Sequence, residues 1–383
     1  MSAKPERKGA VAAAVILVSC MGYSGLFVMP MWVGSVGPLV KFSPFAMGLV
    51  ASGELFAATA ASFATSRIVS RGLIRLGCAG GLLTIGISNI ASAEITDGMW
   101  LSVARIGAGV GEGAVLAFVN ASIAGTSTPD RYFAWSQMGL GVFGLLLFAS
   151  FPPVLDHFGV AGIFMTIGGT ALLVLPLCFR MPVKQKWVKE PTELSTVSPV
   201  LWRSIAGLGV IFVGCQGMWA FLVRAGEAKG LQTEYVARVL ILGQVLGLFG
   251  PLVAQAIGKR LSWRSAVVFG LSVSSLAVIS ATQALPPSSF AVSAYAFQFG
   301  TLSIVTSYLS YLAMHDKTGK SAAAASSALN LGCAAGPAGV GMLWSLSGPV
   351  FAGWAVLTSY GLGYLLLLSE RSTTRQGVSR YRL

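Results

Sequence analysis

Residues 99–124 read MWLSVARIGAGVGEGAVLAFVNASIA, an apolar segment with two ionisable side chains, Arg105 and Glu112, in its middle. A helix needs about 20 predominantly apolar residues to cross the hydrocarbon core of a bilayer, and this segment is long enough. A charge at the centre of such a helix costs about 2.5–3.5 kcal/mol, whereas each Leu, Ile, Phe or Val returns only about 0.3–0.6 kcal/mol. The segment therefore predicts a membrane helix whose two charges face protein or a watery cavity.

The rest of the chain repeats this apolar pattern. Hydrophobic residues make up 55% of the 383 residues and charged residues only 10%, against about 25% charged residues in an average soluble domain. We predict an all-α integral membrane protein with twelve transmembrane helices. The predicted spans are residues 9–33, 44–66, 74–93, 99–124, 133–155, 160–180, 203–223, 235–257, 265–284, 289–314, 321–346 and 350–369.

Basic residues indicate how the chain is oriented. Most of the 26 Lys and Arg residues fall in alternate gaps between spans, whereas the intervening gaps hold only Lys41, Arg224 and Lys229. Basic loops stay on the cytoplasmic side during insertion, so both termini are predicted to be cytoplasmic. The net charge of +13 is then explained by loops that face anionic lipid headgroups, and no nucleic-acid partner is expected. We expect a multi-pass protein of a bacterial inner (plasma) membrane.

The chain contains signs of an internal duplication. The longest hydrophilic segment, residues 181–202, separates a predicted six-helix bundle at 1–180 from a second one at 203–383. An offset of 193 residues relates the basic loops after the second and eighth spans, Arg67-x3-Arg71-x5-Gly77 and Arg260-x3-Arg264-x5-Gly270. Two pseudo-symmetric bundles around a site at the bilayer midplane are typical of secondary transporters.

Polar residues near mid-span mark a candidate substrate site. The same offset pairs Tyr23 with Gln216, Arg105 with Gln298, and Gln137 with Asn330, and Trp219 shares a helix face with Gln216. The candidate substrate-binding residues are Arg105, Tyr23, Gln137, Gln216, Trp219, Gln298 and Asn330. Any one of the uncharged residues Tyr23, Gln137, Gln216, Gln298 and Asn330 is more often an interhelical hydrogen-bonding residue than a ligand contact.

Two carboxyl groups are candidates for proton coupling. Arg105 and Glu112 lie seven residues apart, on one helix face and about 10 Å apart along the axis. Side chains lean toward the helix N-terminus, so direct pairing is imperfect and leaves room for a ligand, a water or a residue of another helix. Glu54 lies mid-span with no charged partner nearby in sequence. Intramembrane ionisable groups commonly serve relays. The alternatives are an ion pair that only orients helices and, for Glu54, a neutral hydrogen-bonded carboxyl.

Three motifs resemble the major facilitator superfamily. The segment Arg105-Ile-Gly-Ala-Gly109-Val-Gly111-Glu112-Gly113 is similar to that family's Arg-x-x-x-Gly-x-Gly pattern in helix four. Its Gly-Glu-Gly part resembles the proton-coupled organic-anion symporters and the Spinster-like transporters. Arg67 and Arg71 match the arginines of the family's basic loop, although its acid and glycine are absent. Gly332, Gly336 and Pro337 are similar to a glycine–proline motif of the superfamily. The resemblance implies conformational roles for Gly332, Gly336 and Pro337, and likewise for Arg67 and Arg71.

The remaining residues exclude other classes. No Gly-x4-Gly-Lys-Ser/Thr loop is present, so an ATP-driven pump is not expected. The five cysteines are far apart and the two histidines lie in opposite loops, so neither a metal site, a cofactor nor an enzymatic constellation is expected.

The function expected from these observations is transport. We predict a monomeric secondary transporter that moves a small organic solute, an organic anion with proton symport, by alternating access. Two alternatives stay open: a proton-driven exporter (antiporter) of metabolites or drugs, and a non-transporting membrane sensor or scaffold.

Overall fold

The computed structural model of the protein describes residues 5–37, 39–69, 73–94, 97–126, 128–182, 199–315 and 320–368. All regular elements of these residues are helices, and they form nine helical stretches, some of them joining consecutive elements, that are long and apolar enough to cross a membrane. The elements are α1 (Pro5–Gly22), α2 (Ser24–Val36), α3 (Pro44–Ile68), α4 (Ile74–Ala93), α5 (Gly98–Ala124), α6 (Pro129–Val174), η1 (Leu175–Arg180), α7 (Pro199–Ala228), α8 (Thr233–Gly247), α9 (Gly250–Arg260), α10 (Trp263–Thr282), η2 (Pro287–Ser289), α11 (Phe290–His315) and α12 (Lys320–Leu368).

Several helices begin at side chains that accept hydrogen bonds from the first turn. Ser43 Oγ accepts from Ala46 N at 3.2 Å before α3, and Asp97 Oδ1 accepts from Trp100 N at 2.7 Å before α5. Ser262 caps α10 in the same way. Such caps satisfy one of the N–H groups that the first turn leaves free. They fix the residue at which each of these three apolar helices begins.

Four predicted spans are joined in two pairs, where separate helices were predicted. The spans 133–155 and 160–180 are joined through a turn at Gly159 (φ 61°), and the spans 321–346 and 350–369 through a turn at Gly348 (φ 78°). Both turns need positive φ, which glycine adopts without a steric penalty.

Two predicted spans are interrupted, which corrects the expectation of continuous helices. The span 9–33 is divided into α1 and α2 at Tyr23, whose φ and ψ are −108° and 5°. The span 235–257 is divided into α8 and α9 at residues 248–249. Pro251, which lies in the first turn of α9, has no N–H to continue the hydrogen-bond ladder of α8.

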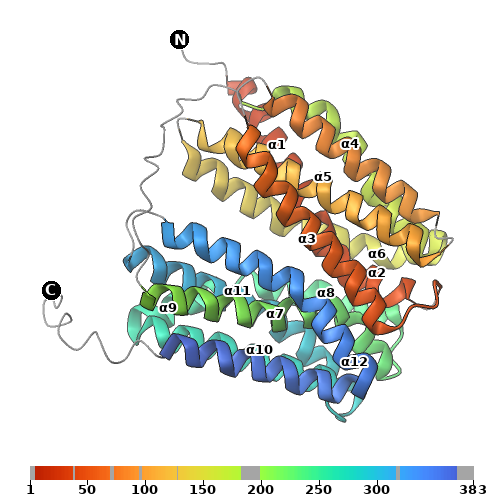
Figure 1. Ribbon diagram of the computed structural model, residues 1–383, viewed down its shortest axis with the longest axis vertical. Helices are drawn as coiled ribbons and strands as arrows, with labels where there is room; N and C mark the ends of the chain where they lie inside the picture. The colour runs from red at the N-terminus through yellow and green to blue at the C-terminus, as the bar shows by residue number, and fades with distance from the viewer. Residues whose placement is uncertain are drawn as a thin grey trace, which may run out of the picture.

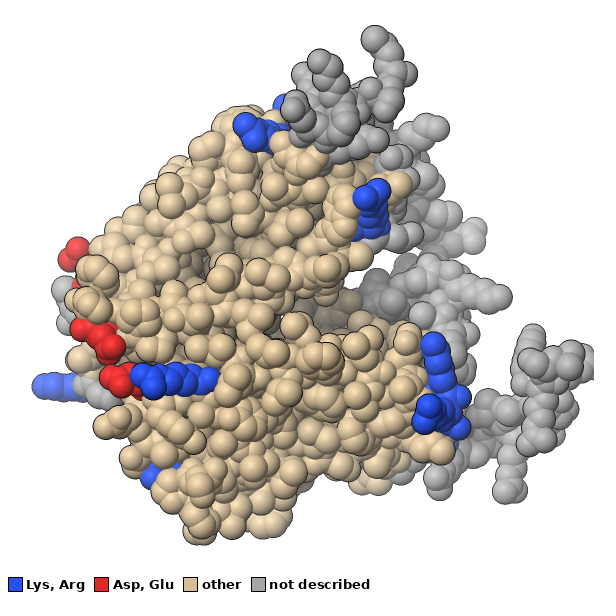
Figure 2. Space-filling view, turned by 180° about the vertical axis from the view of Figure 1, so that it is seen from behind, with Lys and Arg blue, Asp and Glu red and all other residues tan. Residues whose placement is uncertain are grey.

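The helices gather into two groups, which we call the first group (α1–α6) and the second group (α7–α12) (Figure 1). Helices α2, α3 and α6 of the first group pack on α7, α12 and α8 of the second. Phe45 N donates to Ser345 Oγ at 2.8 Å, and Ala338 N donates to Ser52 Oγ at 2.9 Å. These bonds lie toward the end of the molecule opposite the start of α1. A gap between the groups opens toward the other end (Figure 2).

Charges are distributed unequally between the two ends. Among the described residues, exposed carboxylates gather at the end where the groups touch (Figure 2). They are Glu94, Asp97, Asp156 and Glu234, with Glu227 half-buried. Asp156, Glu227 and Glu234 line one open hollow of about 380 Å³ between α2, α6, α7 and α8. The membrane orientation predicted from the basic loops stays a prediction.

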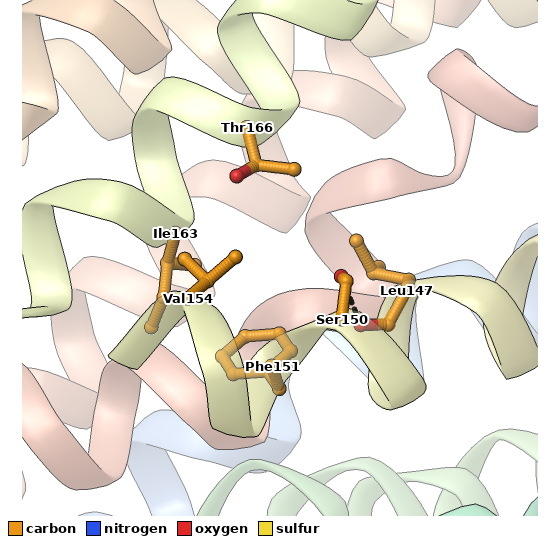
Figure 3. Close-up of a pocket in the computed structure, with 6 residues that line it drawn as sticks. All are labelled: Leu147, Ser150, Phe151, Val154, Ile163 and Thr166. Atoms are coloured by element: carbon orange, nitrogen blue, oxygen red, sulfur yellow. Dashed lines mark hydrogen bonds between the residues drawn. The ribbon is translucent and has the colours of Figure 1, made fainter. Parts of the chain in front are cut away.

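A small cavity between the two arms of α6 illustrates how the first group is packed (Figure 3). It is lined by Leu147, Ser150, Phe151, Val154, Ile163 and Thr166. Its volume of about 10 Å³ is at the lower limit for one water molecule. Ser150 Oγ donates to Leu147 O at 2.7 Å and therefore needs no partner in the cavity. This space is a packing gap and not a solute site.

Glycines allow close approach both within and between the groups, and this predicts two different mutant phenotypes. A Cβ on Gly336 would lie 2.5 Å from Val213 O and 2.6 Å from Gly217 N of α7, inside the second group. A Cβ on Gly48 would instead meet the backbone of Pro337 and Ala338, across the groups. Overpacking costs about 1–3 kcal/mol, and sometimes more. We expect Gly336→Leu to lower the melting temperature of the purified protein in every conformation.

The matched variant Gly48→Leu should keep the melting temperature near that of the wild type but hinder closure of α3 on α12. The distance between spin labels at exposed Leu39 and Leu346 should therefore increase in Gly48→Leu and not in Gly336→Leu. Equal loss of stability in both variants would contradict this assignment.

Candidate functional site

The centre of the first group holds a buried ion pair between α3 and α5. Arg105 Nη1 lies 3.1 Å from Glu54 Oε1, and neither side chain has any exposed surface. Arg105 Nε donates to Ser92 Oγ at 3.1 Å and Nη2 donates to Asn89 Oδ1 at 3.0 Å, both on α4. All three guanidinium nitrogens are therefore bonded. The imperfect pairing of Arg105 with Glu112 left room for a residue of another helix. That residue is Glu54.

Small residues bring α3 and α5 close enough for this pair. A Cβ on Gly113 would lie 2.8 Å from the carbonyl carbon of Ala58 and 2.9 Å from Ser62 N. A Cβ on Gly109 would meet the carbonyl of Glu54 itself. Glycines spaced four apart let membrane helices approach with their backbones. The helix-four glycines thus position the arginine of their own helix against the glutamate of α3.

Two aromatic rings cover the guanidinium group. The Arg105 Cζ atom lies 4.9 Å from the ring centre of Phe164 and 6.0 Å from that of Trp32. Both rings are within the range where an aromatic face attracts a cation. They also exclude water from the ion pair, because Phe164 and Trp32 are themselves fully buried.

Glu112 is bonded to the break between α1 and α2. Gly25 N donates to Glu112 Oε1 at 2.7 Å, and Ser24 Oγ donates to the same oxygen at 3.1 Å. The first turn of any helix has N–H groups without intrahelical partners, and its positive end favours an anion. The interruption at Tyr23 therefore supplies Glu112 with a backbone donor in the interior of the first group.

The two carboxyl groups converge on Gly25. A Cβ at this position would lie 2.5 Å from Glu54 Oε1 and 2.6 Å and 2.8 Å from the two oxygens of Glu112. Glycine is thus the residue that leaves room for both. Among the described residues Glu54 Oε2 has no hydrogen-bond partner, although it is buried.

The charges of this cluster do not balance when every group is ionised. Glu54, Glu112 and Arg105 then carry one negative charge in excess, and one proton on either carboxyl makes the cluster neutral. An uncompensated buried charge is costly. One proton on either carboxyl would therefore lower the cost of burying this cluster.

Other predicted substrate residues lie in different environments. Gln216 is buried and its Nε2 lies 3.6 Å from Met29 Sδ, while Trp219 is 4% exposed. Tyr23 and Gln298 are half-buried, whereas Gln137 and Asn330 are exposed. The structure does not gather all of them at one point around Arg105.

The predicted conformational residues fall into two places. Gly332, Gly336 and Pro337 are buried where α12 packs on α7 and α3. Arg67 is exposed and lies over the ring of Phe63 at 4.3 Å. Arg71 is outside the described residues.

Four residues of the cluster were missed by the sequence analysis: Ser24, Gly25, Asn89 and Ser92. Asn89 and Ser92 are polar residues three apart in an apolar span, a spacing that puts them on one helix face. That signal could have identified them. Nothing in the local sequence around Ser24 and Gly25 distinguishes them from many other small residues of this chain.

An aromatic wall lies between the two groups. The Trp219 ring of α7 is stacked on Phe297 of α11, with centroids 5.9 Å apart and planes at 12°. Phe148 of α6 packs edge-on against it at 5.8 Å. Trp219 Nε1 donates across the groups to Leu26 O at 2.9 Å.

Membrane-length helices in two groups, with a buried charge cluster at a helix break, define a polytopic membrane protein of the transporter class. The chain belongs to the Major Facilitator Superfamily, whose sequence profile matches residues 11–338. The resemblance seen in the helix-four motif is thereby confirmed. A search of curated protein sequences gave no significant match.

Solved transporter structures share the fold at low sequence identity. An inward-facing, occupied bacterial homologue of the human lysosomal transporter Spinster is 15% identical with a TM-score of 0.70, covering 96% of this chain and 94% of that one. The nucleoside transporter NupG is 13% identical with a TM-score of 0.72, covering 95% and 98%. A D-xylose–proton symporter is 16% identical with a TM-score of 0.73, covering 94% and 96%.

Proposed function

We propose that this protein is a proton-coupled secondary transporter of a small organic solute, with Glu54 and Glu112 as the proton-carrying pair. The observation that carries the proposal is the convergence of both carboxyl groups on Gly25, with one guanidinium group to neutralise them. In this proposal Arg105 acts as a fixed counter-charge, since Glu54, Asn89 and Ser92 occupy its nitrogens. The proton is held by the carboxyl that the arginine leaves uncompensated.

The architecture supports an alternating-access mechanism. In the proposal, residues 1–180 and 203–383 are two six-helix bundles of a twelve-helix protein, joined by residues 181–202. The bundles rock about the contacts of α2, α3 and α6 with α7, α12 and α8. With the termini in the cytoplasm, the gap between the groups faces inward and the acid-rich end is closed toward the outside.

The polar residues between the groups supply the solute contacts in this proposal. Gln137 and Asn330 are exposed, and Tyr23 and Gln298 are half-buried. Gln216 and Trp219 are nearly covered and would complete the site as the groups move. This set offers amide and hydroxyl groups beside aromatic rings, which suits a neutral or amphipathic organic solute.

The ion pair changes the expectation of an anionic substrate. An anion bound by Arg105 would need this arginine to be unpaired when Glu112 is protonated, but Arg105 is paired with Glu54. The cluster has an excess of acid instead. We therefore favour exchange of protons for a neutral or cationic solute, the antiporter alternative, over symport of an anion.

Reconstituted protein can test both the coupling and its direction. Proteoliposomes that contain a trapped pH-sensitive dye would be exposed to panels of organic cations, neutral solutes and organic anions. We expect an organic cation or a neutral solute to drive protons out of the compartment that it enters. Protons that move together with an organic anion would restore the symport interpretation. Solute flux that is indifferent to the pH gradient would contradict proton coupling, and the absence of any flux would favour the sensor or scaffold.

A further inference from the structure

Pro30 leaves a backbone carbonyl of α2 available to the second group of helices. Pro30 lies inside α2 and has no N–H. In an α-helix, the N–H of residue 30 would bond to the carbonyl of residue 26. The carbonyl of Leu26 is the one that Trp219 Nε1 bonds, at 2.9 Å. The proline and the indole are therefore complementary, although they belong to different groups of helices.

The same turn of α2 is bonded to Glu112. Gly25 N and Ser24 Oγ donate to the Glu112 carboxylate, and Leu26 follows directly. In this one helical turn, an N–H group bonds to the proposed proton site and a carbonyl group accepts from Trp219. We propose that Trp219 is the positioning residue that transmits the state of Glu112 to the second group, through the first turn of α2. This inference rests on the proposed function.

The rings around Trp219 suit this role. Stacking on Phe297 and edge contact with Phe148 hold the indole, which is 4% exposed, in one orientation. When Glu112 is ionised, Gly25 N–H bonds to a charged acceptor, a stronger hydrogen bond than one to a neutral carboxyl. Protonation of Glu112 weakens that bond and frees the turn to shift. The shift then moves Leu26 O relative to an indole that cannot follow it.

Few other titratable groups could make this turn of α2 respond to pH. The charged groups acting on Glu112 are Glu54 of α3 and Arg105 of α5. Tyr23 lies at the break itself. The other ionisable groups on the helices packed against α5 are Glu6, Arg7, Lys8 and Cys20 of α1, Arg67 of α3, Arg75 and Cys78 of α4, and Asp130, Arg131, Tyr132, Asp156 and His157 of α6. Arg75 is bonded to Met181 O and Arg131 lies over Trp135, so neither is directed at Glu112.

Two substitutions act on this hydrogen bond from opposite sides, one by removing its donor and the other by adding a second donor to its acceptor. Trp219→Phe keeps an aromatic ring for Phe297 and Phe148 but loses the N–H. Pro30→Ala restores an N–H that competes for Leu26 O and leaves Trp219 intact. The matched control is Trp344→Phe, because Trp344 of α12 is stacked on Phe221 of α7, within the second group, with centroids 5.5 Å apart.

The measurement is a spin-label distance across the end where the groups touch. Labels on Leu39→Cys and Leu346→Cys use exposed positions, whereas all five native cysteines are buried. In otherwise wild-type protein, the ratio of closed to open populations should change with pH. At a fixed pH, one net hydrogen bond corresponds to a roughly 2- to 12-fold change in that ratio. We expect Trp219→Phe and Pro30→Ala to lower the ratio by this amount and to flatten its pH dependence, and Trp344→Phe to do neither.

The outcomes separate this inference from the proposed function. A wild-type pH response that persists in both Trp219→Phe and Pro30→Ala would overturn the role of Trp219 and leave proton coupling intact. A wild-type protein whose populations and solute flux ignore pH would overturn the proposed function itself. If Trp219→Phe fails to fold, Pro30→Ala decides the question, because it changes no aromatic contact of Trp219.

Discussion

Replacement of Glu112 by glutamine should abolish solute accumulation driven by a pH gradient while sparing exchange of solute for solute. Glutamine has nearly the same shape and can still accept from Gly25 N and Ser24 Oγ through its amide oxygen. It cannot bind or release a proton, so the gradient has nothing to act on at this position. Exchange survives because swapping one solute molecule for another needs no net movement of protons. The measurement is flux into proteoliposomes with and without the gradient.

The control for this variant is Glu94→Gln, which removes an exposed carboxylate just after α4. It should keep both gradient-driven accumulation and exchange. Gradient-driven accumulation that is unchanged in Glu112→Gln would rule out Glu112 as the carrier. The same result would leave Glu54 as the candidate, although its ion pair with Arg105 makes Glu54→Gln a test of folding as well.

Replacement of Arg105 by methionine should cause the largest loss of stability of any single substitution in the cluster. The change leaves Glu54 and Glu112 buried without a counter-charge, and it removes the donors to Ser92 and Asn89. Removing one partner of a buried ion pair costs about 3–5 kcal/mol. We expect a marked fall in the melting temperature of the purified protein and in its yield.

A double variant distinguishes the loss of charge balance from the loss of packing. Arg105→Met combined with Glu54→Gln removes both members of the ion pair, so much of the stability should return. Arg105→Lys is the complementary control, since it keeps the charge but cannot place one nitrogen on each of three partners. A double variant no more stable than Arg105→Met alone would show that the arginine acts through its contacts with α4 and the aromatic rings.

The identity of the charged residues was readable from the sequence, but their partners were not. Arg105 and Glu112 were predicted to share a face of one helix, and both are buried in α5. Glu54 had no charged partner near it in the chain, yet it bonds to Arg105, 51 residues away. That pairing depends on how α3 is rotated and shifted against Gly109 and Gly113, which no local pattern specifies.

The break at Tyr23 shows a similar limit. The apolar run from residue 9 to residue 33 satisfies the length and hydropathy of one continuous span, so a single helix was predicted. Neither Tyr23 nor its immediate neighbours is a proline. In the structure, the Glu112 carboxylate accepts from Gly25 N and Ser24 Oγ and stabilises the interrupted backbone. A side chain nearly 90 residues away thus contributes to the local structure, and a sequence window cannot contain it.

The sequence by itself determined that this is an all-helical membrane protein of the Major Facilitator Superfamily. Hydropathy over about 20 residues is a local property, because each span must satisfy its own backbone in the absence of water. The helix-four motif is local as well, since Arg105, the glycines and Glu112 share one helix. Only the tertiary structure decided that Glu54 neutralises Arg105, that Glu112 meets a broken helix, and that Trp219 reaches Leu26. These contacts arise where separate helices pack. Their geometry depends on how each helix is rotated and shifted against its neighbours, and a local stretch of sequence does not specify this.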